Sequence, residues 1–600
     1  MSKCIASICI LLLAGCTQTR DRIPETAMTQ QPSGKVVVYQ LMTRLFGNTQ
    51  TANQPYGTRE VNGVGKFSHI NETALSGIRE LGVTHIWYTG VLEHATLSDY
   101  SAMGIPADHP DIVKGRAGSP YAIRDYYDID PDLADQPGQR MKEFEDLIRR
   151  THDAGLKAII DFVPNHVARS YRSDLKPVGV ADLGENDDVS RPFSPSNNFY
   201  YLPGQRFQSP SNYTSLGAAN PFPSNGKAYE EFPAKVTGND QFVPNPSVYE
   251  WYETVKLNYG VDIQGGRKTY FEPVPDTWGK MKDILIFWSG KGVDGFRCDM
   301  AEMVPVEFWN WVIPQVRALY PDVLFIAEIY NPREYRRYID QGRFDFLYDK
   351  VQLYDTLRDL LRQHGSAAYI HHIQQELADI DRHLVHFMEN HDEQRLASPQ
   401  LLGDPWKACP AMVVSATIDR GAVMVYFGQE VGEPGAGSEG FGQDDGRTTM
   451  FDYWGVPEHQ KWVNNHAYDG GGLSLEQKQL RIFYSDLLNL ARTSPAIAQG
   501  AYEDLTSELR KTGAIQDDRV QVFARYFESD RLVIVSSFSD KPAHLRIAIP
   551  PALAEKMGLL GDNTWNGRDL LGSGTDVALS KDFVFEVDVQ PFGYYIFKFK

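Results

Sequence analysis

Cysteine is scarce in this 600-residue chain, and three of its five cysteines lie within the first sixteen residues. Only Cys298 and Cys409 remain in the body of the chain, and both stand in apolar stretches. We therefore predict two buried thiols rather than a disulfide bridge.

Positively charged residues are also relatively few: the chain has 59 lysines and arginines and 78 acidic residues, which gives a formal net charge of -19. This balance argues against nucleic acid and against an anionic membrane surface as partners, and a neutral polar substrate fits better. Internal repeats and low-complexity segments are missing. The 42% hydrophobic content is that of a globular protein, and the length calls for two to four domains.

Long hydrophobic runs are few, and one that stands out is too short to span a bilayer. It covers residues 5–13, follows Lys3 and ends in Leu13-Ala14-Gly15-Cys16. This resembles a bacterial lipobox, which implies cleavage before Cys16 and lipidation of that cysteine; an ordinary secretory signal is the alternative. We read residues 1–16 as signal and lipobox and 17–34 as a flexible tether, so we expect an exported, lipid-anchored protein facing the periplasm or the cell exterior.

Short apolar runs alternate with helical patterns along most of the chain, as in a parallel α/β fold. The eight runs are residues 35–41, 84–88, 156–162, 295–299, 324–329, 344–348, 384–389 and 422–427, and two of the helical patterns cover 139–154 and 306–320. We predict a (β/α)8 TIM barrel formed by residues 35–167 and 276–495, with its catalytic face at the C-terminal strand ends.

Two regions break this alternation. Residues 168–275 are rich in Asn, Pro, Gly, Ser and Tyr, and a loop of that length without structure of its own is improbable, so we predict an inserted small domain after the third strand. Residues 496–600 read as a C-terminal antiparallel β-sandwich, with strands expected at 520–526, 531–538, 544–549, 583–589 and 594–599.

The stretch at residues 292–302, GVDGFRCDMAE, carries the clearest chemical signal. Side chains alternate along a strand, so Arg297 and Asp299 should point to one side and Cys298 to the other. An arginine beside a carboxylate keeps it ionised, which is what a glycosidase nucleophile requires. A purely structural Arg–Asp pair is the alternative for this motif taken alone.

Acidic residues end four of the predicted strands. They belong to the segments DFVPNH at 161–166, RCD at 297–299, AE at 327–328 and ENHD at 389–392. Like charges gathered at a barrel mouth split their pKa values, so that one carboxyl stays protonated while another is ionised. Glycoside hydrolysis needs this division of roles.

Together the segments DFVPNH, GFRCDMAE, AEIY and ENHD resemble, in order, the four sequence signatures of the α-amylase family, glycoside hydrolase family 13. By this resemblance Asp299 is the nucleophile, Glu328 the general acid/base and Asp392 the stabiliser of the distorted sugar. The resemblance further assigns Arg297 to orienting Asp299, His166 and His391 to sugar hydroxyls, Asp161 to a supporting place, and Tyr121, in PYAIRDYY, to stacking under the sugar.

The resemblance requires no cofactor for the chemistry but leaves open a structural calcium ion, with Asn165 as one ligand. Many family members carry Lys-His three and four residues after the nucleophile, where this chain has Glu302 and Met303. We therefore expect an altered contact to the acceptor sugar.

We expect a retaining hydrolase of α-glucosidic bonds in starch-derived glucans or maltooligosaccharides. A transglycosidase with the same residues is the nearest alternative, and the sequence does not separate the two. A metal-dependent barrel enzyme is disfavoured because Arg297 would sit in the metal shell and no lysine base stands at a strand end. A non-catalytic carbohydrate-binding or partner-binding protein is disfavoured because all three acids are present.

Overall fold

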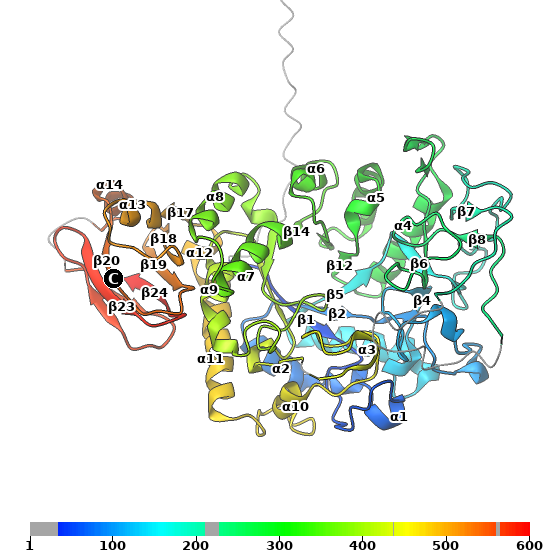
Figure 1. Ribbon diagram of the computed structural model, residues 1–600, viewed down its shortest axis with the longest axis horizontal. Helices are drawn as coiled ribbons and strands as arrows, with labels where there is room; N and C mark the ends of the chain where they lie inside the picture. The colour runs from blue at the N-terminus through cyan, green and yellow to red at the C-terminus, as the bar shows by residue number, and fades with distance from the viewer. Residues whose placement is uncertain (1–33, 211–226, 436, 560–563) are drawn as a thin grey trace, which may run out of the picture. The chain divides into compact units, whose positions relative to one another are not determined.

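The computed structural model describes residues 34–210, 227–435, 437–559 and 564–600 (Figure 1). The predicted signal and lipobox with Cys16, and the tether up to residue 33, lie outside the described residues. No helix in the described part of the chain is long and apolar enough to cross a membrane.

Eight parallel strands close into a barrel, in the order in which they follow one another along the chain. They are β1 (Val37–Met42), β2 (His85–Thr89), β5 (Lys157–Phe162), β12 (Gly295–Cys298), β13 (Leu324–Ala327), β14 (Phe346–Tyr348), β15 (Leu384–Phe387) and β16 (Ala422–Tyr426). Each overlaps one predicted strand, so the TIM barrel is confirmed. The barrel strands are apolar along their length because both of their faces are buried: helices cover the outside of the barrel, and side chains fill its interior.

Helices separate the barrel strands and cover the barrel from outside (Figure 1). The main ones are α2 (Glu72–Glu80), α3 (Arg140–Asp153), α4 (Asp276–Gly290), α5 (Val306–Leu319), α6 (Tyr335–Asp340), α7 (Asp355–Leu361), α8 (Ala368–Leu377), α9 (Cys409–Thr417), α10 (Pro457–Val463) and α11 (Leu475–Thr493). Two of them, α3 and α5, match the predicted helical patterns. Helix α3 buries Phe144, Leu147 and Ile148, the spacing of one helical face. Helix α11 begins at a capping box between Ser474 and Gln477.

The predicted inserted domain lies between β5 and α4 and contains small antiparallel sheets. The pairs are β6 (His166–Ala168) with β9 (Thr254–Lys256), β7 (Tyr201–Leu202) with β8 (Ala234–Lys235), and β10 (Val261–Asp262) with β11 (Lys268–Thr269). A further pair, β3 (Leu92–His94) with β4 (Ile123–Ile129), lies in the long connection between β2 and β5. The pairing of β6 with β9 places His166 opposite Lys256.

The C-terminal strands form a six-stranded antiparallel sheet faced by a two-stranded one, as predicted. The larger sheet has the order β17 (Ala501–Asp504), β18 (Val520–Phe527), β19 (Asp530–Ser537), β24 (Tyr594–Phe599), β21 (Asn566–Asp569) and β22 (Asp576–Ala578), and the smaller pairs β20 (Ala543–Ala548) with β23 (Val584–Val589). Helices α12 (Pro495–Ala498), α13 (Thr506–Lys511) and α14 (Pro551–Lys556) complete this region. One cluster of buried residues fills the sandwich, whereas Phe523 and Ile534 belong to the core shared with the barrel.

The two body cysteines are free, buried thiols, which confirms the prediction made for them. Cys298 lies in the core on β12, whereas its neighbours Arg297 and Asp299 contact each other across one pleat at 2.6 Å. The alternation expected of that strand is therefore present, and it delivers both polar side chains to the same side of the barrel.

Candidate active site

The Arg297 guanidinium lies at the centre of the acidic strand ends. Its Nη1 is 2.6 Å from Asp299 Oδ1 and 3.5 Å from Asp161 Oδ1, and its Nη2 is 2.8 Å from Glu328 Oε2. These carboxylates come from the ends of β5, β12 and β13, which are neighbours in the barrel. One buried cation thus ties together acids that lie far apart in the sequence.

Aromatic rings enclose the same guanidinium. Its Cζ lies 5.1 Å from the ring centre of Trp87, 5.3 Å from that of Tyr121 and 5.6 Å from that of Tyr348. The electron-rich faces of such rings attract a cation, and their bulk keeps water away from it. The ion pairs of Arg297 are therefore stronger than they would be at a surface.

Asp299 and Glu328 contact the same guanidinium, and each influences the protonation of the other. Burial raises the pKa of both carboxyl groups, and the charge of Arg297 opposes the rise in each. The hydrogen bond from Arg297 also lowers the pKa of Asp299, while the charge of Asp299 raises that of Glu328. The proton that the pair holds therefore resides on Glu328, and Asp299 carries the negative charge.

Two neighbours fix the orientation of the Glu328 carboxyl group. The backbone N–H of Met300 donates to Oε2 at 2.8 Å, and the Tyr330 hydroxyl donates to Oε1 at 2.8 Å. Met300 adopts a left-handed backbone conformation with φ 43°, which is uncommon for a residue other than glycine and is often found at functional sites. This turn directly after Asp299 aims the amide at Glu328.

Asp392 lies at the open side of the centre, with 35% of its side-chain surface exposed, against 8% for Asp299 and 3% for Glu328. Its Oδ2 is 3.1 Å from Nε2 of His391. Burial raises the pKa of Asp392 to about 7. Asp392 is thus the acid of the three that solvent, or a bound sugar, reaches most easily.

His391 is held from both sides of its ring. The Gln40 side-chain amide donates to Nδ1 at 2.8 Å, and the Tyr121 hydroxyl lies 2.6 Å from Nε2. Burial and the charge of Arg297 keep the pKa of His391 well below its usual value, so the ring is neutral. With Nδ1 accepting from Gln40, the ring proton sits on Nε2 and can donate to Asp392. Tyr121 also stacks on the imidazole, with ring centres 5.1 Å apart.

Asp161 stands behind the nucleophile. Its Oδ2 accepts hydrogen bonds from Trp87 Nε1 at 3.0 Å and from the backbone N–H of Gly90 at 3.3 Å. Burial raises its pKa to about 7, against the charge of Arg297. These contacts hold Asp161 beside Arg297, and the supporting role that the resemblance implied for it stays a prediction.

His166 and Asn165 lie where β5 passes into the insert. Asn165 Nδ2 is 3.0 Å from His166 Nδ1 and donates to the backbone carbonyl of Gly238 at 2.9 Å. Burial lowers the pKa of His166 to about 3, so the ring is neutral. Asn165 Oδ1 accepts a hydrogen bond from the Lys256 ammonium.

Four side chains of this centre were not singled out from the sequence: Gln40, Trp87, Tyr330 and Tyr348. The sequence could have identified Gln40 as a candidate site residue, because it is a polar residue near the C-terminal end of an otherwise apolar strand. Tyr330 was a less obvious candidate, and its only indication in the sequence is that it follows Glu328 by two positions. The rings of Trp87 and Tyr348 cannot be told from core aromatics by pattern alone.

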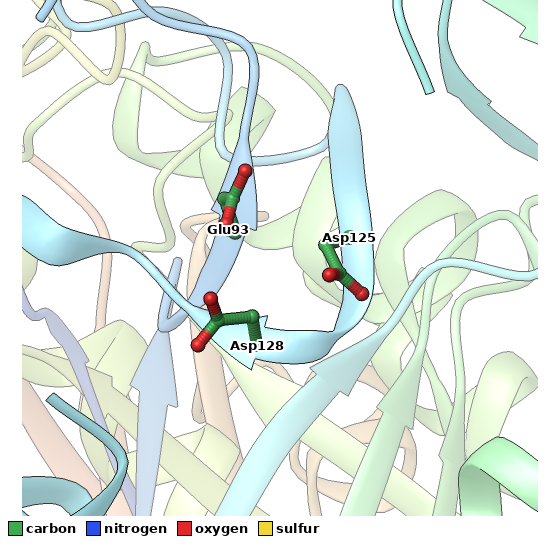
Figure 2. Close-up of side chains that lie close together, drawn as sticks. All are labelled: Glu93, Asp125 and Asp128. Atoms are coloured by element: carbon green, nitrogen blue, oxygen red, sulfur yellow. The ribbon is translucent and has the colours of Figure 1, made fainter. Parts of the chain in front are cut away.

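A second acidic group lies outside this centre, where Glu93 on β3 approaches Asp125 and Asp128 on β4 (Figure 2). One oxygen of each lies within 4.8 Å of the others. Arg140 Nε contacts both oxygens of Asp128 at 2.9 Å, and the Ser173 hydroxyl donates to Asp125 at 2.6 Å. Glu93 is buried without a hydrogen bond in the described structure, and burial raises its pKa to about 9. At neutral pH this group therefore holds a proton on Glu93.

A parallel barrel that gathers acidic side chains around one arginine at its strand ends is the architecture of a (β/α)8-barrel glycosidase. The family described as "Alpha amylase, catalytic domain" matches residues 40–466 of the chain. The chain belongs to the α-amylase family and is a glycosidase of that family.

The chain is similar to several curated relatives at low identity. It is 23% identical over 435 residues to alpha-amylase 3 of Dictyoglomus thermophilum, covering 67% of this chain and 73% of the relative. It is 22% identical over 527 residues to a cyclomaltodextrinase of a Bacillus species, covering 85% and 73%. With neopullulanase 2 of Thermoactinomyces vulgaris it shares 22% identity and spans 59% of that protein.

Solved structures support the same fold. An alpha-amylase from Lactobacillus plantarum superposes with a TM-score of 0.58 at 18% identity, covering 94% of this chain and 98% of that one. An alpha-amylase from Geobacillus thermoleovorans, complexed with acarbose, gives 0.59 at 18% identity, covering 95% and 98%. At this identity the likeness concerns the fold alone.

Proposed function

We propose that the protein is a retaining hydrolase that cleaves α-glucosidic bonds in maltooligosaccharides or starch-derived glucans. One observation carries the retaining mechanism: Asp299 and Glu328 follow the neighbouring strands β12 and β13 and contact the same guanidinium, at 2.6 and 2.8 Å. Inverting enzymes keep their two carboxyl groups about 6.5–9.5 Å apart to admit a water molecule, whereas retaining enzymes keep them about 5–5.5 Å apart. The closeness of this pair favours direct attack by a carboxylate.

In the first step the Asp299 carboxylate attacks the anomeric carbon and the bond to the leaving oxygen breaks. Glu328, which holds the proton of the pair, gives it to that oxygen, so the departing sugar leaves as a neutral alcohol. In the second step Glu328, now ionised, takes a proton from water. The resulting hydroxyl attacks the same carbon, releases Asp299 and restores the α-configuration.

The other predicted site residues fit around the reacting sugar. Asp392 stabilises the oxocarbenium-like transition state from the open side, and neutral His391 and His166 hydrogen-bond sugar hydroxyls. The ring of Tyr121, which contacts His391 and Arg297, would stack under the reacting sugar. A neutral sugar suits a strongly acidic protein better than an anionic ligand does.

The choice of an α-glucan substrate is supported by the names of the relatives, which include alpha-amylase, cyclomaltodextrinase and neopullulanase. A transglycosidase remains the second candidate, because a cyclomaltodextrin glucanotransferase of a Bacillus species is 23% identical over 435 residues. In that reaction a sugar hydroxyl replaces water in the second step, with the same three acids.

Incubation with starch, pullulan and maltooligosaccharides, with products separated by size, tests both candidates. Hydrolysis gives only shorter chains, whereas transglycosylation also gives chains longer than the starting oligosaccharide. Rapid NMR of the first-formed product should show the α-anomer. A β-anomer would rule out the two-step mechanism, and failure to act on all three substrates would rule out the proposed substrate class.

We also propose that the chain is exported and held at a bacterial membrane by lipid on Cys16. The lipobox-like Leu13-Ala14-Gly15-Cys16, which follows a short apolar run, supports this proposal. Labelling of expressing cells with a fatty acid should tag the wild type and not Cys16→Ser. Equal labelling of the two proteins would contradict the anchor.

A further inference from the structure

A lysine ammonium occupies the junction between the barrel and the insert. Lys256, at the end of β9, points its Nζ at Asn165 Oδ1 on the barrel side and pairs with Asp240 Oδ1 at 2.9 Å on the insert side. Only 5% of its side chain is exposed, against 29% for Asp240. The two oxygens thus converge on one buried positive charge.

The oxygens around this ammonium are of the kind that calcium prefers, an amide carbonyl and a carboxylate. Calcium needs six to eight oxygen ligands at about 2.3–2.6 Å, and a cation at that distance from Asn165 and Asp240 would overlap the Lys256 ammonium. Charge repulsion would add to the clash. The residues present therefore do not fit a calcium ion bound through Asn165.

We propose that Lys256 is a built-in cation that replaces a structural calcium ion at Asn165 and joins the insert to the barrel in its place. Asn165 links this junction to His166. Its Nδ2 donates a hydrogen bond to the backbone carbonyl of Gly238 in the insert and lies 3.0 Å from His166 Nδ1. Lys256 is a positioning residue in this scheme. It fixes Asn165, and Asn165 fixes the neutral ring of His166.

The ion pair with Asp240 offsets the cost of burying a cation at this point. Burial lowers the pKa of Lys256, and the carboxylate of Asp240 opposes the change. Removing one member of a buried ion pair is strongly destabilising, because it leaves the other charged and unpaired. Loss of the ammonium would leave Asp240 and Asn165 Oδ1 without their partner, and these are the groups that a calcium ion could then bind.

The test compares the full-length protein with Lys256→Ser, Asp240→Asn and the double variant, each melted in EDTA and in millimolar calcium. Lys256→Ser removes the ammonium and opens space for a cation. Lys235→Ser is the matched control, because Lys235 also lies in the insert near an acidic partner, Glu231 Oε2 at 3.7 Å.

We expect calcium to shift the Tm of the wild type and of Asp240→Asn by the same amount, whatever the size of that shift. Lys256→Ser should have a lower Tm than the wild type in EDTA and should gain an additional calcium-dependent rise of at least about 2 °C. The double variant and Lys235→Ser should lack that additional rise. Isothermal titration with calcium should show one more bound ion per chain in Lys256→Ser than in the wild type.

Two results would overturn the proposal. One is a calcium-dependent Tm in the wild type that disappears in Asp240→Asn, since this would place the ion beside Lys256. The other is a Lys256→Ser protein with unchanged Tm in EDTA and no gain of calcium response. If Lys256→Ser does not fold, Lys256→Met is melted in its place; it keeps the length of the side chain, and an unchanged Tm in EDTA would overturn the proposal equally.

Discussion

Replacement of Arg297 by methionine should change the pH dependence of catalysis, beyond lowering the rate. Methionine keeps a long, unbranched side chain within the cage of Trp87, Tyr121 and Tyr348 but removes the charge that Asp299 and Glu328 share. Arg297 lowers the pKa of both carboxyl groups. Without it both pKa values rise.

The size of the effect follows from the contacts that are lost. Removing one partner of a buried ion pair costs about 3–5 kcal/mol, and here the cost falls on the ionised form of Asp299, which must attack. Even 3 kcal/mol corresponds to a loss of about 150-fold in kcat/KM at neutral pH. Because the loss reflects protonation of Asp299, activity should recover in part as the pH rises, while the raised pKa of Glu328 keeps the general acid protonated.

The assay measures kcat/KM on an aryl α-maltooligosaccharide across the pH range, together with Tm. Arg395→Met is the matched control, since Arg395 is also fully buried and pairs with a strand-end acid, Glu389 Oε2, at 2.8 Å. Its hydrogen bonds go to Glu389, Phe427 O and Thr448, not to the three candidate catalytic acids. Both variants should lose stability, but only Arg297→Met should shift its pH profile to higher pH.

Activity of Arg297→Met within threefold of the wild type, with an unchanged profile, would refute this reasoning. A shift of the same size in Arg395→Met would also refute it, because the effect would then follow from loss of any buried charge.

Asp299→Asn should abolish turnover while leaving the fold, followed by circular dichroism, and the affinity for maltooligosaccharides, measured by titration calorimetry, largely intact; full activity would end its assignment as nucleophile. Gln40→Leu should lower kcat/KM about tenfold, the equivalent of one hydrogen bond of about 1.4 kcal/mol to His391, and a rate equal to the wild type would show that the bond does not orient the ring. Glu93 has a pKa of about 9 when folded, above its unfolded value near 4.5, so the stability it confers is complete below pH 4.5 and is lost as the pH rises toward 9. Glu93→Gln keeps the uncharged form, and its Tm should exceed that of the wild type by a margin that grows between pH 5 and 9; a margin independent of pH would contradict the raised pKa.

The eight barrel strands could be predicted because each is a short apolar run between helical patterns, and a strand enclosed between interior side chains and helices must be apolar along its length. The predicted strand at residues 295–299 and the observed β12 (Gly295–Cys298) differ only at the end. The terminal sheet was recognised less completely. Its strands β17, β21 and β22 were missed because they are short and polar; β21 reads Asn-Gly-Arg-Asp, which has no alternation to detect.

Local sequence also placed the three acids at strand ends, because the C-terminal ends of parallel strands face one edge of a barrel. The local sequence could not predict the contacts that determine the protonation of these acids. Gln40 and His391 are 351 positions apart, and Lys256 and Asn165 are 91 apart. No periodicity in one segment carries information about such a partner.

The amino-acid sequence by itself determined the barrel and the identity of its acidic residues, since both depend on the pattern of apolar and polar side chains within short segments. Only the tertiary structure decided how Arg297 divides its charge between Asp299 and Glu328, and that an ammonium fills the junction beside Asn165. Charge and burial act through space, so their effect on a pKa or a cation site is fixed only when distant segments come together.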